Sequence, residues 1–556
     1  MATMNQKRGN VQMKKDTKTT INHHGTTVHK LNTLETLFSK VLGSLFGEST
    51  YYEKRNPEDE FKSVQSLISG IPDEDVEYAL KVARIGREYN MIQFPLAVLT
   101  ACFNDDRFKG DKFVDEQTGK NKLQTYTDYI VRRGRDITDI VAMQMNVYGF
   151  NVVKKGRSKN THRDIPLPMQ LRKSLKMKLE SFNEYQLSKA LGEKRSVSLA
   201  DVVKLLHPNP SKARVSDDFF KRVIEGKVEF GGSEETKQIQ SEIAKVNNKN
   251  NKATKSDVKK SIDTSTVMAI VKNLVALHNN GMLDAEVINS VCSKLTNAKE
   301  VQKSRLLPFR FYSAYEEVNH LPNFRGKRQI LDALVEALDL SIDNLQTING
   351  YSAIVIDRSG SMQHPISSMS NVTADIVACI LGAICFKKGI GDVYVFADRC
   401  ELVSNISTKS TVMDIMHQIM NKYVGGCTYL DKALETVARS GVKYDNMIIL
   451  TDSDCYYTNG NTFTIGQRYN YDRLSSDSLV NDLFRKGIIK KCYVNNMLGN
   501  DFTIINTDDF RKNLITGFSE RVIDVINTYS SIGTDASDVR MIIDSIIEKL
   551  PTRQQR

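Results

Sequence analysis

The ten residues from Ser352 to Ser361 constrain the fold of this chain more than any other segment. They run Ser-Ala-Ile-Val-Ile-Asp-Arg-Ser-Gly-Ser, so an apolar stretch of strand length leads directly into Asp357-x-Ser359-x-Ser361. A carboxylate and two hydroxyls at alternate positions of a turn can face one hard cation, which prefers oxygen ligands. The pattern predicts a divalent-cation site at the edge of a sheet. The alternative is that the three side chains only cap the following turn and helix, as Asp and Ser often do.

The sequence after Gly350 alternates between strand and helix lengths. Short apolar runs are separated by amphipathic segments, which favours a parallel, doubly wound α/β sheet. Ligands of such sheets bind beyond the carboxyl ends of the strands, and Asp357 follows one such end. The expected strands are 352–356, 393–397, 446–450 and 491–494, and the expected helices are 372–386, 412–423 and 430–440.

The preceding part, residues 34–345, has helical periodicity almost throughout. Leu34, Leu37, Phe38, Val41 and Leu42 begin one apolar helix face, with the spacing of a helix that is buried on one side. Many short amphipathic helices joined by short polar turns predict stacked helix pairs, an α-helical HEAT-like solenoid. Residues 231–261 are Asn- and Lys-rich, and we expect them to form a solvated loop.

Composition limits the class of protein. The chain has 556 residues, so two or three domains are expected, and its net charge of +11 favours a polyanionic partner if the charge is clustered. The eight cysteines show no Cys-x-x-Cys pair, which indicates free thiols in a reducing, cytoplasmic compartment. Residues 1–30 are polar and predict a disordered basic tail rather than a signal peptide. The apolar run 376–386 is too short to span a membrane.

Positive charge is concentrated between Lys154 and Arg195, where twelve lysines and arginines face four acidic residues. The first part is a predicted loop that contributes Lys154, Lys155, Arg157, Lys159 and Arg163. In the helix that follows, about 100° per residue places Arg172, Lys173 and Lys176 on one arc away from the apolar stripe. A basic helix face beside a basic loop suits contacts to phosphates, whereas the simpler interpretation is a solvated face.

Three more oxygen-bearing side chains occur where a sheet-edge site needs them. Thr428 lies in a Gly-Gly-Cys-Thr loop before a predicted helix, and Asp398 and Asp452 follow predicted strands. Together with Asp357-x-Ser359-x-Ser361, this order resembles the von Willebrand factor A module. The resemblance implies a metal-ion-dependent adhesion site, usually holding Mg²⁺, at Asp357, Ser359, Ser361, Thr428 and Asp452. It also implies an open coordination position for an outside carboxylate.

The chain departs from that family pattern at two places. Cys427 stands between the glycines and Thr428, so the residue that faces the cation is uncertain by one position. Ser453 and Asp454 follow Asp452, where the family often has Gly. These departures leave the occupancy of the site open.

A second resemblance concerns the helical part. The stretch from Ser198 to Pro210, which contains His207-Pro-Asn-Pro, resembles the TROVE module of Ro ribonucleoproteins, as do 305–315 and 517–526. The resemblance implies a ring in which helical repeats (31–346) are closed by the A domain (347–530), followed by a C-terminal helix and tail (531–556). It further implies that small Y-like RNA binds the basic outer surface, with His207, and that single-stranded ends of misfolded RNA enter the central hole. Taken alone, His207 is more often a helix-terminal residue.

These observations predict a noncoding-RNA-binding protein of the Ro type, acting in RNA quality control or turnover, without catalytic activity and as a monomer away from membranes. A ribonuclease or adaptor that presents a carboxylate would bind the metal site. The alternative is a metal-dependent protein–protein adhesion module on a helical scaffold. A metal-dependent hydrolase is disfavoured, because no His base is near the motif in sequence and no second-metal cluster is evident.

Overall fold

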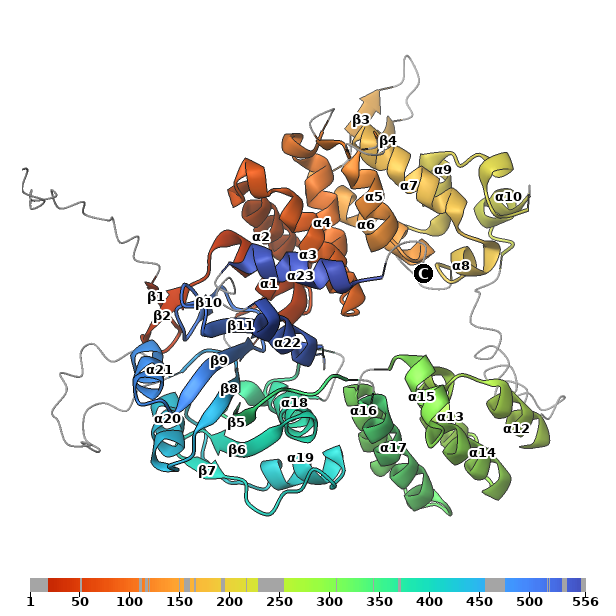
Figure 1. Ribbon diagram of the computed structural model, residues 1–556. Helices are drawn as coiled ribbons and strands as arrows, with labels where there is room; N and C mark the ends of the chain where they lie inside the picture. Colours follow the sequence, from red (N-terminus) through yellow and green to blue (C-terminus); the bar gives the residue numbers. More distant parts are fainter. Residues whose placement is uncertain are drawn as a thin grey trace, which may run out of the picture.

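The fold is described from a computed structural model of the chain. The residues it describes are 19–50, 53–109, 113–115, 119, 121–149, 151–154, 161–164, 167–191, 196–216, 218–228, 255–306, 308–343, 345–368, 372–455, 476–517, 519, 521–532 and 538–551. As expected from the sequence, a helical part precedes an α/β part with one six-stranded sheet (Figure 1).

The first group of helices shares one hydrophobic core. Its first helix begins at the capping box of Asn32 and Glu35 and buries the predicted face, including Leu37 and Phe38. The helices are α1 (Thr33–Gly43), α2 (Pro57–Gly70), α3 (Glu77–Glu88), α4 (Gln93–Asn104), α5 (Lys122–Ile130), α6 (Gly134–Tyr148), α7 (Met169–Ser181), α8 (Glu184–Ser188), α9 (Leu199–Leu206) and α10 (Phe219–Ile224). A short hairpin of β3 (Asn151–Lys154) and β4 (Thr161–Asp164) stands between α6 and α7.

The second group of helices leads into the α/β part, which corresponds to the expected A domain (347–530) and keeps that name below. It comprises α12 (Lys255–Thr264), α13 (Val267–Asn279), α14 (Ala285–Leu295), α15 (Ala298–Ser304), α16 (Pro308–Asn319) and α17 (Lys327–Ser341). Part of the expected loop 231–261 is therefore helical, because Val258 and Ile262 are fully buried in the core of this group. The rest of that loop, up to residue 254, lies outside the described residues.

The sheet of the A domain has the order β11-β9-β8-β5-β6-β7. Its strands are β5 (Tyr351–Asp357), β6 (Ile390–Phe396), β7 (Cys400–Leu402), β8 (Tyr444–Thr451), β9 (Ile489–Asn496) and β11 (Lys512–Thr516), and all pair in parallel except β7. The four expected strands are confirmed, and the two edge strands β7 and β11 are additional.

Helices cover both faces of this sheet. Ile354 and Ile356 of β5 belong to the core that includes α18 (Ala374–Lys388), α19 (Val412–Met420) and α22 (Val522–Ile532). Ala353 and Val355 point to the opposite face, towards α20 (Leu430–Arg439) and α21 (Ser476–Arg485). This alternation explains why β5 is an uninterrupted apolar run, since a strand buried on both faces has no polar side.

The start of the chain is attached to the A domain. Strands β1 (Thr19–Ile21) and β2 (Thr27–Lys30) form a hairpin, and β2 pairs with β10 (Phe502–Thr503). The expectation of a disordered tail over residues 1–30 is therefore wrong for 19–30, while residues 1–18 lie outside the described part. The sequence pattern did not predict this hairpin, because the hairpin buries little apolar surface of its own and is ordered by pairing with a distant strand.

Helix α1 continues this attachment. The Thr516 hydroxyl donates to the carbonyl of Ser39 (3.0 Å), and the Ser44 hydroxyl donates to the carbonyl of Leu498 (2.9 Å). A β-carbon on Gly43 would collide with the Thr516 hydroxyl and lie 3.0 Å from the carbonyl oxygen of Asn496. The close approach of α1 to the sheet thus requires glycine at position 43.

The last described helix contacts both the helical part and the A domain. The C-terminal helix α23 (Val539–Lys549) packs against α3 of the helical part and α22 of the A domain. The carboxylate of Asp544 accepts hydrogen bonds from Tyr78 (2.6 Å) and Lys81 (2.5 Å). Each end of the chain is therefore bound to the other part of the molecule, which joins the two parts at two places.

All eight cysteines are free thiols. In the described part of the chain, no helix combines the length and the apolar character that crossing a membrane requires.

We predict that Gly43→Ala destabilises the protein by about 1–3 kcal/mol, because the added methyl group overpacks the contact between α1 and the sheet. Urea denaturation would measure the change. Gly70→Ala is the matched control, since Gly70 also ends a helix and its new methyl group would meet only the side chain of Thr33, at 3.3 Å. Equal stability of the two variants would contradict the proposed close approach.

Candidate nucleic-acid interface and metal centre

The basic face predicted on α7 is present. Leu171, Leu175 and Leu179 are fully buried, while Lys173 is exposed and Arg172 and Lys176 are partly exposed. None of these three cations forms an ion pair with another described residue. By contrast, Lys178 on the same helix pairs with Asp128 (3.5 Å). The face therefore presents positive charge that its described neighbours leave unneutralised.

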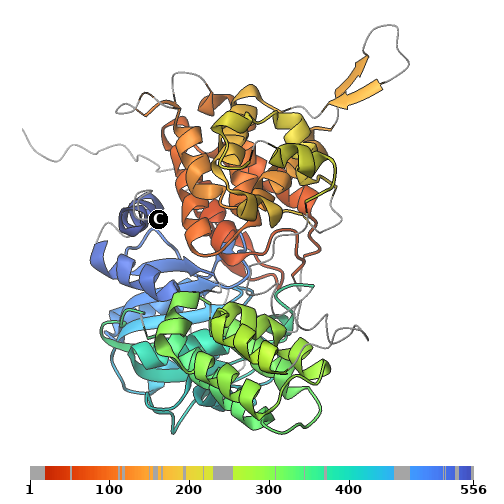
Figure 2. The ribbon, with the colours of Figure 1, turned by 90° about the vertical axis from the view of Figure 1, so that its right-hand side faces the viewer.

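The basic loop before α7 is only partly described. Lys154 ends β3 and Arg163 lies in β4, so these two belong to a hairpin rather than to a loop. This hairpin projects away from the helices in Figure 2. Lys155, Arg157 and Lys159 lie outside the described residues.

His207 is the C-cap of α9, as the simpler interpretation of the sequence indicates. It adopts a left-handed backbone conformation (φ 47°), its N–H donates to the carbonyl of Val203 (3.0 Å), and it is exposed. The Glu180 carboxylate of α7 accepts a hydrogen bond from the N–H of Asn209 (2.6 Å). This bond fixes the loop that starts at His207 against the end of the basic helix.

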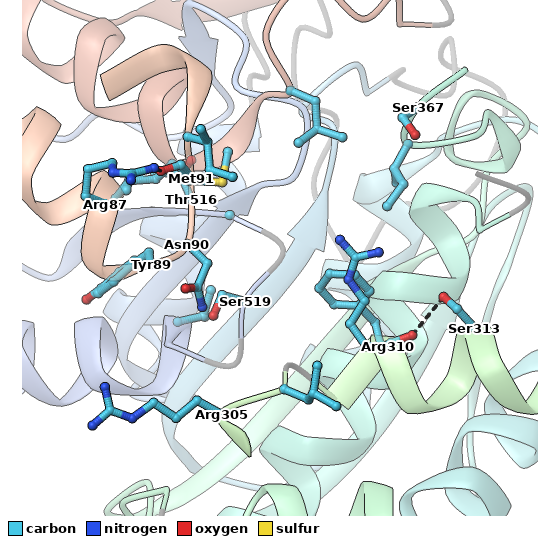
Figure 3. A pocket seen from close by; sticks show the side chains of 18 of the residues that line it. Arg87, Tyr89, Asn90, Met91, Arg305, Arg310, Ser313, Ser367, Thr516 and Ser519 are labelled. Carbon is cyan, nitrogen blue, oxygen red and sulfur yellow. Dashed lines mark hydrogen bonds between the residues drawn. The ribbon is translucent and has the colours of Figure 1, made fainter. Parts of the chain in front are cut away.

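A cavity of about 500 Å³ lies where the first helices, the second helices and the A domain meet (Figure 3). Residues of the α3–α4 turn line one side, residues of α16 line another, and the end of β11 together with Ile366 and Ser367 contributes the A-domain wall. Five arginines line it: Arg87, Arg132, Arg133, Arg305 and Arg310.

The five arginines differ in their partners. Arg87 and Arg133 both bind the buried carboxylate of Asp136 (2.7 Å each), and Arg132 binds Glu88 (2.6 Å). Arg305 and Arg310 are exposed and form no ion pair with any described residue. Arg310 lies beside the Phe309 ring, 5.1 Å from its centroid. The cavity therefore offers two free guanidinium groups and an aromatic ring to a ligand.

The sequence motifs predicted for a metal meet at the carboxyl edge of the sheet. Asp357 ends β5, and Asp452 directly follows the neighbouring strand β8. The N–H of Ser359 donates to Asp357 Oδ1 (2.9 Å), and the hydroxyls of Ser359 and Ser361 lie 3.2 Å apart. The predicted side chains are thus brought together on two adjacent strands.

The loop that carries Thr428 reaches the same place. The N–H of Gly360 donates to the carbonyl of Gly426 (2.8 Å), which joins this loop to the serine loop. Thr428 is 2% exposed whereas Cys427 is exposed, so the threonine is the residue that faces inward. Asp398 has another role: it accepts hydrogen bonds from the N–H groups of Cys427 (2.6 Å) and Gly426 (3.1 Å), and the former holds the pKa of Asp398 below its usual value.

The electrostatics of this edge suit a bound cation. Asp357 and Asp452 are fully buried, and burial together with the charge of Asp452 raises the pKa of Asp357 to about 7. Burial likewise raises the pKa of Asp452, whose Oδ2 atom has no hydrogen-bond partner among the described residues. Two buried carboxylates and three hydroxyls match the oxygen ligands of a hard divalent cation. Hydroxyls are essential to such a site, because within the described residues no three His, Cys, Asp or Glu side chains are arranged so that they could hold a metal ion by themselves.

Sequence reasoning missed the arginines of the cavity. Arg305 and Arg310 lie in the stretch 305–315, which resembles the TROVE module, but the sequence of this stretch does not indicate a cavity. Arg87, Arg132 and Arg133 come from segments that lie about 170 to 220 residues earlier. These segments come together only where the first helices, the second helices and the A domain pack around the cavity.

Comparisons with known proteins agree with this architecture. The TROVE domain family matches residues 260–358, and the Ro60 vWA domain family matches residues 352–530. The RNA-binding protein RO60 of Deinococcus radiodurans is 22% identical over 206 residues, which cover 35% of this chain and 38% of that protein. The match therefore spans little more than a third of the relative.

A solved structure shows the same fold. The crystal structure of the Deinococcus radiodurans RO (RSR) protein covers 90% of this chain and 99% of its own, with a TM-score of 0.55 and 15% identity. Proximal thread matrix protein 1 from the mussel byssus is similar over 37% of this chain and 52% of its own, at 16% identity and a TM-score of 0.20.

We predict that the metal-free protein loses stability as the pH rises from 5.5 to 8. Its folded state keeps a proton on Asp357 up to about pH 7, whereas the unfolded chain releases that proton near pH 4, so stability falls within this window. Asp357→Asn removes this titration and should reduce the loss by roughly 1–3 kcal/mol. Urea denaturation in EDTA at both pH values would test this, and equal losses in both proteins would contradict it.

Proposed function

This chain carries the TROVE domain and the Ro60 von Willebrand A domain of the Ro family, in that order, and we propose that it binds small noncoding RNA. The curated relative that it matches is described as an RNA-binding protein. The proposed ligands are Y-like small RNAs and the single-stranded ends of misfolded RNA. Such binding would place the protein in RNA quality control or turnover.

The observation that carries this proposal is the presence of two cationic sites with unneutralised charge. On α7, Arg172, Lys173 and Lys176 face solvent without a described counter-ion. A helix face of this kind contacts the phosphates of a structured RNA, whose deep groove side chains cannot read. Recognition there would depend on the shape of the RNA more than on its sequence.

The cavity suits a different part of an RNA. Arg305 and Arg310 supply charge for phosphates, and Phe309 supplies a ring on which a base can stack. Its volume of about 500 Å³ suits a short single strand rather than a duplex. The outer face and the cavity would therefore bind the folded body and the unpaired end of an RNA.

The proposed role of the metal site is to recruit a protein. Asp357, Ser359, Ser361, Thr428 and Asp452 would hold the cation, which we propose to be Mg²⁺. When bound, it would offer a coordination position to a carboxylate of a partner such as a ribonuclease or its adaptor. We propose no catalytic activity for this chain, because each of the five side chains is assigned as a ligand of the cation.

We predict that the combined change Arg172→Ala, Lys173→Ala and Lys176→Ala weakens binding of a stem–loop RNA at least tenfold near 0.1 M salt. The loss of three phosphate contacts should also make the negative slope of log K against log salt less steep by about 2. Filter binding across a salt series measures both quantities.

The matched control replaces three exposed lysines of the A domain, Lys409, Lys443 and Lys486, with Ala. It removes the same charge and should leave the slope unchanged. If both triple variants bind like the unaltered protein, the interface on α7 is refuted, and the adhesion module on a helical scaffold becomes the better description.

We further predict that Arg305→Asn with Arg310→Gln weakens binding of a ten-nucleotide oligouridine roughly tenfold or more. Asn is chosen at position 305 because Arg305 has a left-handed backbone (φ 52°), which Asn tolerates. Binding of a blunt RNA hairpin should change little, since that ligand has no unpaired end. Fluorescence anisotropy with both RNAs separates the two sites, and an equal loss for both would argue against a single-strand site in the cavity.

A further inference from the structure

The turn after β8 is held in an unfavourable backbone conformation. Ser453 has φ 68°, in the left-handed region that a residue with a β-carbon adopts only with steric strain. Its buried hydroxyl has no hydrogen-bond partner among the described residues. Nothing in the Ser453 side chain therefore compensates for the strain, so neighbouring groups must hold the turn.

Part of the support comes from the first residues of the chain that the structure describes. The tip of the β1–β2 hairpin contacts the turn, 431 residues away in sequence. Both the N–H and the Nδ1 atom of His23 bind the Asp454 carboxylate, at 3.0 and 2.7 Å. The side-chain NH2 group of Asn22 donates to the carbonyl of Cys455 (2.9 Å). The Oδ1 atom of Asn22 accepts hydrogen bonds from the N–H groups of His24 and Thr26, which shapes the tip.

These contacts lead directly to a proposed cation ligand. The N–H of Asp454 donates to Asp452 Oδ1 (3.0 Å), and the Asn500 amide donates to the carbonyl of Asp452 (2.7 Å). With Oδ1 held in this way, the buried Oδ2 atom of Asp452 has no hydrogen-bond partner in the described part of the chain. The position of Asp454 therefore determines where the free oxygen of Asp452 points.

We propose that the β1–β2 hairpin is part of the cation site: His23 and Asn22 position the turn at Ser453 so that Asp452 Oδ2 faces the ion. His23 is thus a positioning residue that acts through Asp454 and Asp452. This inference rests on the proposed cation site. It adds that the beginning of the chain is required for tight binding at a sheet edge whose motifs all lie more than 330 residues later.

The test titrates the full-length protein with Mn²⁺ alone and follows free Mn²⁺ by electron paramagnetic resonance. His23→Ala should weaken Mn²⁺ binding about tenfold, the usual effect of removing a group that orients a metal ligand. His23→Asn should restore most of the affinity, because the Asn amide can donate from nearly the position of His Nδ1. Thr27→Ala, an exposed position on the same hairpin, is the control and should bind like the unaltered protein.

Thermal unfolding distinguishes positioning from general stabilisation. If His23 positions the ligand, His23→Ala should reduce the increase in Tm that saturating Mn²⁺ produces. If it only stabilises the hairpin, Tm should fall equally with and without Mn²⁺ while the affinity stays unchanged, and that result would overturn the inference.

Asp357→Asn separates failure of the inference from failure of the site. If the unaltered protein binds Mn²⁺, Asp357→Asn does not, and His23→Ala binds normally, the site stands and the role of the hairpin is refuted. If the unaltered protein binds no Mn²⁺, or Asp357→Asn binds it equally well, the cation site itself is refuted and the inference falls with it.

Discussion

The docking of α1 against the end of the sheet is the contact on which the rest of the architecture depends. Gly43 allows the helix to approach β11 and the turn after β9, and the Ser39 carbonyl and Ser44 hydroxyl complete the contact. The same segment brings the β1–β2 hairpin to β10 and Leu42 and Leu45 to the central cavity. Without this contact the first helices would be held to the A domain mainly through α23, and the cavity would lose its A-domain wall.

Electrostatics divide the molecule into two regions of opposite character. The helical part carries cations on α7 and in the cavity that have no ion-pair partner among the described residues, whereas the A domain buries two carboxylates beside each other at the edge of its sheet. The loop that follows Ser361 touches both regions, because Ile366 and Ser367 line the cavity. A polyanion and a cation can thus bind to neighbouring surfaces without competing for the same side chains.

Local sequence patterns predicted the helices, the central strands and the residues at the strand ends. The period of 3.6 located the helices, the apolar runs located the four central strands, and strand-terminal Asp357 and Asp452 were correctly expected to meet, because parallel strands end at one edge. Whether Thr428 or Cys427 faces inward was decided only by burial. The hairpin at 19–30, the arginine cavity and the contact between His23 and Asp454 depend on partners hundreds of residues away, which no local pattern encodes.

The distance in sequence between Ser39 and Thr516, 477 residues, has a consequence for the protein as it is being made. At roughly 5–20 residues per second, α1 would leave the ribosome tens of seconds before its partner strand is synthesised. During that time Phe38, buried in the finished protein, would lack the A-domain residues that lie beside it, among them Leu514 and Tyr529. The nascent chain would therefore present this face of α1 to chaperones until translation is almost complete, and a chain terminated early would keep it exposed.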